Sequence, residues 1–103
     1  MRTANLADQS VVFTCLAGLA VTHPNLPAPY LTLSRHLPQE VAVQLDSPAA
    51  VEAWREVLGV APDRVVADRI GDRPSLEFKS RAFGVHFFVY AVYTPATQPV
   101  GAT

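Results

Sequence analysis

The run GVHFFVYAVY at residues 84–93 constrains the fold more than any other segment, because it is apolar on both sides of an extended chain. In a strand, one side would carry Val85, Phe87, Val89, Ala91 and Tyr93, and the other His86, Phe88, Tyr90 and Val92. Neither set can face water along its whole length. The run therefore predicts a central strand covered on both faces, by helices or by a second subunit.

A strand and a capped helix are predicted before this run. EVAVQLD at residues 40–46 alternates between apolar and polar side chains, which is typical of a half-buried antiparallel strand. Ser47 is suited to cap the helix that follows, Pro48 to occupy its first position and Gly59 to end it. The helix would bury a stripe of Ala50, Val51, Trp54, Val57 and Leu58.

The N-terminal segment predicts another helix, from about Asn5 to Val21. One line at helical spacing carries Leu6, Ser10, Phe13, Ala17 and Ala20, and Val12, Leu16 and Leu19 widen it. Past Ser10 this helix is nearly apolar all round. It should pack against a sheet or against its own copy in a dimer.

Further strands are predicted at residues 30–35, 64–70 and 74–81, the last with Leu76 and Phe78 inward and Glu77 and Lys79 outward. The expected fold is α+β: an N-terminal helix, then β-β-α-β-β-β, with a mostly antiparallel sheet and the helices on one face. We expect a single domain over residues 1–94 and a flexible tail over residues 95–103, which contain two prolines.

The composition predicts association with a partner. Half of the 103 residues are hydrophobic and only 17% are charged, against roughly 25% in an ordinary soluble domain. A small domain cannot bury all of this apolar surface, and a homodimer is the simplest way to cover it. A protein partner of unknown identity is the alternative. The expected interface residues are Phe13, Leu16, Phe87, Phe88 and Tyr90.

The net charge of −1 gives no long-range attraction for nucleic acid or an anionic membrane. Arg69, Arg73, Lys79 and Arg81 could still form a local phosphate-binding patch, or equally a solvated strand face.

The apolar run 11–21 is too short to cross a bilayer, which takes ~20 residues, so we expect a cytoplasmic protein. The single Cys15 excludes an intrachain disulfide and should behave as a small hydrophobe.

From Gln39, the order strand, helix, strand, strand, strand resembles one module of the vicinal oxygen chelate superfamily, which includes glyoxalases and bleomycin-resistance proteins. Gln39 stands where that family often has a metal ligand, Asp46 at the strand end, and Leu58 with Gly59 at the helix end. The resemblance implies a metal or small-ligand site with Gln39 and His86 as the nearest candidates. The last strand, however, lacks the Glu that the family supplies there.

No catalytic motif is present: the chain has no G-x-S-x-G, HExxH, CxxC or glycine-rich phosphate loop. The run HPNLPAPYLTLS with LDSPAAVEAWREVLGV resembles small actinobacterial proteins of phages and integrative elements, and no activity follows from that resemblance. The sequence thus predicts a non-catalytic accessory protein without metal or cofactor that acts as a homodimer. A chelate-type ligand-binding module and a nucleic-acid accessory factor stay open as alternatives.

Overall fold

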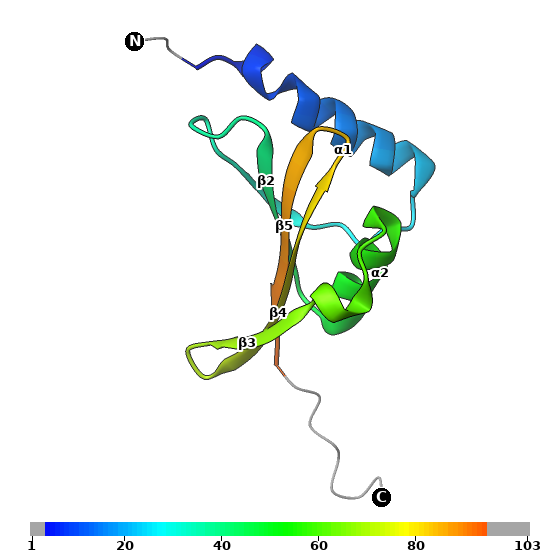
Figure 1. The fold of residues 1–103 in the computed structure, drawn as a ribbon, viewed down its shortest axis with the longest axis vertical. Coiled ribbons are helices and arrows are strands. Elements are labelled where there is room, and N and C mark those ends of the chain that lie inside the picture. Colours follow the sequence, from blue (N-terminus) through cyan, green and yellow to red (C-terminus); the bar gives the residue numbers. More distant parts are fainter. Residues whose placement is uncertain (1–3, 95–103) are drawn as a thin grey trace, which may run out of the picture.

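Two helices lie on one face of a five-stranded sheet in residues 4–94, the part of the chain that the computed structural model describes (Figure 1). The helices are α1 (Ser10–Thr22) and α2 (Pro48–Leu58), with the 3-10 turns η1 (Leu6–Gln9) and η2 (Pro62–Arg64). The strands are β1 (Tyr30–Leu33), β2 (Glu40–Leu45), β3 (Val66–Ile70), β4 (Arg73–Ala82) and β5 (Val85–Val92). The expected α+β class is confirmed. The tail expected at 95–103 lies outside the described residues.

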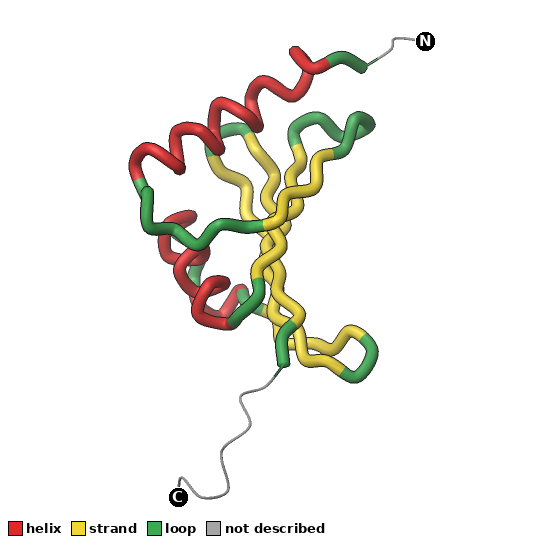
Figure 2. Tube along the Cα trace, turned by 180° about the vertical axis from the view of Figure 1, so that it is seen from behind, coloured by secondary structure: helices red, strands yellow, loops and turns green. Residues whose placement is uncertain are grey.

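The strand order is β1-β2-β5-β4-β3, so β5 is the central strand, as its sequence predicted. Three of the four pairings are antiparallel, and β2 with β5 is parallel. The parallel pair arises because the chain crosses over through α2 and the β3–β4 hairpin before β5 enters between β2 and β4. Viewed from behind, both helices still lie on the same side of the sheet (Figure 2). We call the opposite side the open face.

The core lies between the sheet and the helices. Every second residue of β5 is buried there, and Phe87 is only 2% exposed. The same alternation buries Val41 and Val43 of β2 and Phe78 of β4. The sequence predicted that β5 is covered on both faces. Within the described residues, only this face of β5 is covered.

Local sequence fixes α2 in the expected way. The Ser47 hydroxyl accepts a hydrogen bond from the Ala50 backbone N–H at 3.1 Å, and Gly59 ends the helix with φ of +69°. Trp54 is buried, and its indole Nε1–H donates to the carbonyl oxygen of Pro27 at 2.9 Å. This bond ties the proline-rich connector before β1 to α2.

The stripe predicted for the first helix is correct for Val12, Leu16 and Leu19 but wrong for the line through Phe13. The structure buries Val12 and Leu19, with Cys15 and Leu16 packed partly against the core. The line through Phe13 and the two alanines after it faces outward, and Phe13 is 43% exposed. Apolar periodicity could not choose a side, because residues 10–22 contain no charged side chain that would mark the outer face.

Candidate functional site

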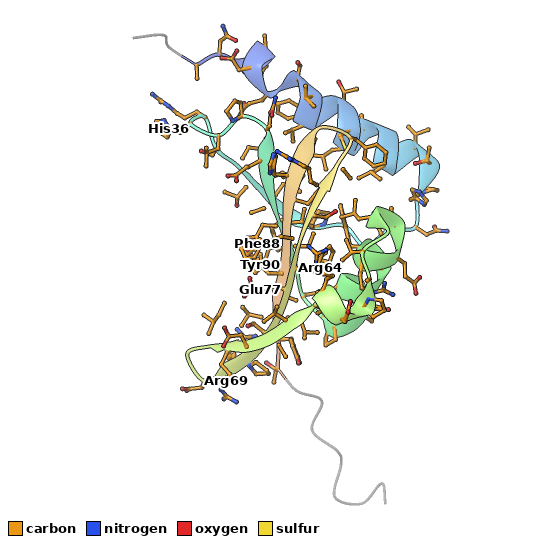
Figure 3. The ribbon with its side chains drawn as sticks, viewed as in Figure 1. His36, Arg64, Arg69, Glu77, Phe88 and Tyr90 are labelled. Atoms are coloured by element: carbon orange, nitrogen blue, oxygen red, sulfur yellow. The ribbon has the colours of Figure 1, made fainter. Side chains whose placement is uncertain are left out.

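The strand register aligns side chains in rows across the open face. One row runs from Thr32 on β1 through Ala42 on β2 and Phe88 on β5 to Lys79 on β4. A neighbouring row places Glu40 opposite His86, and His86 opposite Arg81. Another row holds Gln44, Tyr90 and Glu77. Phe88, Tyr90 and Glu77 project from the sheet on the side away from the helices (Figure 3).

Two aromatic rings form the centre of the open face. The ring centroids of Phe88 and Tyr90 are 5.1 Å apart and their planes differ by 23°, a stacked arrangement. The Tyr90 hydroxyl donates to Gln44 Oε1 at 3.3 Å. The Lys79 ammonium lies 5.9 Å from the centroid of the Phe88 ring, within range of a cation–π contact. Both rings are half-buried, so their positions are set by the neighbouring strands.

A shallow depression of about 800 Å³ lies on this face. The row through Phe88 continues there into the small side chains of Ala42 and Thr32, which leave space beside the ring. We call it the cradle. Its lining includes Thr32, Ser34, Glu40, Ala42, Arg64, Glu77, Lys79, Arg81, His86 and Phe88.

The charges in the cradle are not paired with one another. Arg64, Lys79 and Arg81 contribute three cations, while Glu40 and Glu77 contribute two carboxylates. Within residues 4–94 no ion pair joins a cradle cation to a cradle carboxylate. Cationic side chains therefore line the cradle without an acidic partner.

The two candidate ligand residues do come together. The His86 backbone N–H donates to the carbonyl oxygen of Gln39 at 2.8 Å, and both residues line a hollow of about 310 Å³ beside the β1–β2 loop. The imidazole Nε2, however, accepts a hydrogen bond from Arg81 Nε at 3.2 Å. Nε2 thus already contacts a guanidinium, whose positive charge would repel a metal cation at that nitrogen. Asp46 lies beyond the other end of β2, roughly 23 Å from Gln39 along the strand.

No metal centre assembles in the described part of the chain. Residues 4–94 contain no group of three or more His, Cys, Asp or Glu side chains placed to hold a metal ion. The same residues contain no helix long and apolar enough to cross a membrane.

The four cations of the predicted phosphate patch divide into two pairs. Arg73 begins β4 and Arg81 stands near its end, roughly 27 Å further along the strand. Arg69 lies on the β3–β4 hairpin, far from the β1–β2 loop that carries His36 (Figure 3), and donates to the backbone oxygen of Asp72. Only Lys79 and Arg81 line the cradle, so the four do not form one patch.

The five residues of the predicted interface also separate. Phe87 belongs to the core of its own chain, so it is not available to a partner, and Leu16 packs partly against that core. Phe88 and Tyr90 lie on the open face, whereas Phe13 lies on the outside of α1, across the sheet. No single flat contact could include all five.

Sequence reasoning did not identify Phe83, at the tip of the β4–β5 hairpin, as a functional residue. Phe83 and Gly84 both have positive φ, +55° and +76°, and link the paired residues Ala82 and Val85. A two-residue turn with this geometry favours Asn-Gly, yet the phenylalanine ring is 69% exposed. The unusual pair Phe-Gly between two strands was the available signal.

Cys15 is half-buried on α1, and burial raises the pKa of its thiol. A thiol held in the protonated form is a poor nucleophile. The expectation of a small hydrophobe fits this environment.

Comparison of the chain with protein-family models, with curated proteins and with solved structures finds no significant match.

Proposed function

We propose that the protein is a non-catalytic binding module that acts as a homodimer joined through α1 and Phe83. The observation that carries the proposal is that α1 has no charged side chain in 13 residues, although only Val12 and Leu19 are buried. A surface helix normally presents charged or polar groups to water. An uncharged and largely exposed helix is therefore expected to be covered in the working protein.

Large apolar side chains gather along this part of the molecule. On α1 and the turn before it, Leu6 is 71% exposed, Phe13 43% and Val21 80%. Phe83 joins the same surface, since the hairpin tip meets α1: Phe83 shares a hollow with Val11, and a Cβ on Gly84 would lie 3.5 Å from the Val11 Cγ1 atom. Aromatic anchors of this kind dominate the energy of protein interfaces.

The conformation of Phe83 also supports a binding role. A positive φ costs an L-residue with a bulky side chain on the order of 1 kcal/mol. The exposed ring gains little from its own chain in return. Strain retained for an exposed aromatic side chain is explained if the ring is used in a contact.

A second copy of the chain is the partner that this surface fits best. A two-fold contact brings the same patch together from both subunits, so any charge near the axis would face its own kind. The helix α1 avoids that repulsion because it carries no charged side chain. Its Ala17, Gly18 and Ala20 are small and exposed, which would let two helices approach closely.

Sedimentation equilibrium of purified full-length protein tests the proposal. Wild type should be a dimer, and Val21→Asp should shift it to monomer, because the substitution places two carboxylates in an apolar contact. Val66→Asp is the matched control: it replaces another exposed valine, 53% exposed on β3, and should leave the dimer intact. A monomeric wild type at high concentration would contradict the proposal.

Phe88→Asp distinguishes this dimer from one joined through the open face. If α1 makes the contact, Phe88→Asp stays dimeric. If Phe88→Asp gives monomers while Val21→Asp does not, the dimer forms through the open face and the assignment to α1 is wrong.

A further inference from the structure

We propose that the cradle on the open face binds a small organic anion with a flat apolar body, held by Lys79 and Arg81 at its acidic group and lying beside Phe88. The cradle and α1 are on opposite sides of the sheet, so this site does not depend on the dimer proposed above. Its basis is the combination of unpaired cations, an aromatic floor and a concave shape in one place.

Lys79 and Arg81 are the residues that would bind the acidic group of the ligand. Both side chains are exposed and project from the same face of β4, two residues and about 7 Å apart along the strand. Within residues 4–94 Lys79 has no acidic partner, and its ammonium lies over the Phe88 ring, while the Arg81 guanidinium donates to Nε2 of His86. A carboxylate, sulfonate or phosphate placed between the two side chains would receive charge-assisted hydrogen bonds from both. Arg64 adds a third positive charge at the rim.

Phe88 and Ala42 are the residues that would contact the apolar part of the ligand. They are cross-strand partners on β5 and β2, and both are only partly buried. The small methyl group of Ala42 leaves room next to the ring, where a flat group could stack or pack edge to face. The open volume of about 800 Å³ lies in the range of small-molecule sites.

The acidic residues of the cradle favour a small molecule over a polynucleotide. Glu77 precedes Lys79 along β4, and Glu40 stands on β2 across the cradle. Successive phosphates along a nucleic-acid strand would have to pass these carboxylates, and the chain carries a net charge of −1. A single acidic group avoids them if it points toward Lys79 and Arg81. Glu40 then fixes the orientation by repelling the ligand's acidic end from the β2 side.

Fluorescence titration with 8-anilinonaphthalene-1-sulfonate tests the site, because this probe has a flat aromatic body and one acidic group. Its uncharged analogue N-phenyl-1-naphthylamine is the matched probe. Wild type should bind the sulfonate saturably with one site per chain, and the neutral analogue at least roughly tenfold more weakly, which is the loss expected for a missing charge-assisted contact.

Three variants locate the probe. Lys79→Met should weaken sulfonate binding about tenfold and leave the neutral analogue unchanged. Ala42→Phe should weaken both probes, because the larger ring fills the space beside Phe88. Arg69→Met is the control, since Arg69 lies on the β3–β4 hairpin outside the cradle, and it should bind both probes as wild type does. Thermal melting of each variant verifies that the fold is retained.

Several results would overturn the inference. They are the absence of saturable sulfonate binding to wild type, equal affinity of wild type for the two probes, and equal sulfonate affinity of wild type and Lys79→Met. Loss of sulfonate binding in Val21→Asp, with no change in Lys79→Met or Ala42→Phe, would place the probe on α1 and also exclude the cradle.

Discussion

Replacement of Phe83 by asparagine should change two properties in opposite directions. Asparagine tolerates a positive φ far better than phenylalanine, and Asn-Gly is the preferred pair for this hairpin turn. Relief of the strain should stabilise the isolated subunit by about 1 kcal/mol. For a domain of this size that corresponds to a rise in melting temperature of about 4–8 °C. Little is lost within the chain, because the ring is 69% exposed.

The same substitution should weaken the dimer. If Phe83 is an anchor of the contact, its loss should cost about 2 kcal/mol of association free energy, or roughly a 30-fold increase in the dimer dissociation constant. The stability of the subunit is measured by thermal unfolding in the Val21→Asp background, where the proposal predicts monomers. The dimer dissociation constant is measured by sedimentation of Phe83→Asn alone.

Phe83→Ala separates the two effects. Alanine keeps the unfavourable φ but removes the ring, so it should weaken the dimer without stabilising the subunit. If Phe83→Asn lowers the stability of the monomeric background, the argument from backbone strain is refuted. If it leaves the dimer dissociation constant unchanged, Phe83 has no part in the interface.

Three further predictions concern single contacts. Trp54→Phe removes the donor to the Pro27 carbonyl and should reduce the free energy of unfolding by about 1–3 kcal/mol in urea titration; a loss under about 0.5 kcal/mol would mean that the connector is not held by this bond. The hydrogen bond from Arg55 lowers the pKa of Glu52, so its stabilisation is present above the usual value of 4.5 and is lost as pH falls through the lowered pKa. The stability difference between wild type and Glu52→Gln should therefore shrink from neutral pH to about pH 3, and a constant difference would contradict the assignment. Burial raises the pKa of Cys15, so iodoacetamide should alkylate it more slowly at neutral pH in the folded protein than in urea, and equal rates would show an accessible thiol.

Local features of the chain were determined by the sequence alone. The cap at Ser47, the stop at Gly59 and the alternation of β2 were all predicted, because each depends on residues within one element. Charged residues helped in β4, where Glu77 and Lys79 marked the outer face. The central place of β5 followed from its apolar composition on both sides.

The tertiary structure decided whatever required a choice between two apolar sides. On β5 the sequence could not tell Phe87, which enters the core, from Phe88, which faces the cradle, since both side-chain sets are apolar. On α1 it could not tell the buried Val12 from the exposed Phe13, for the same reason. The parallel pairing of β2 with β5 and the cradle itself depend on contacts between residues far apart in the chain. The periodicity of apolar residues and the composition indicate which residues avoid water, whereas strand order and register decide which of these residues contact one another.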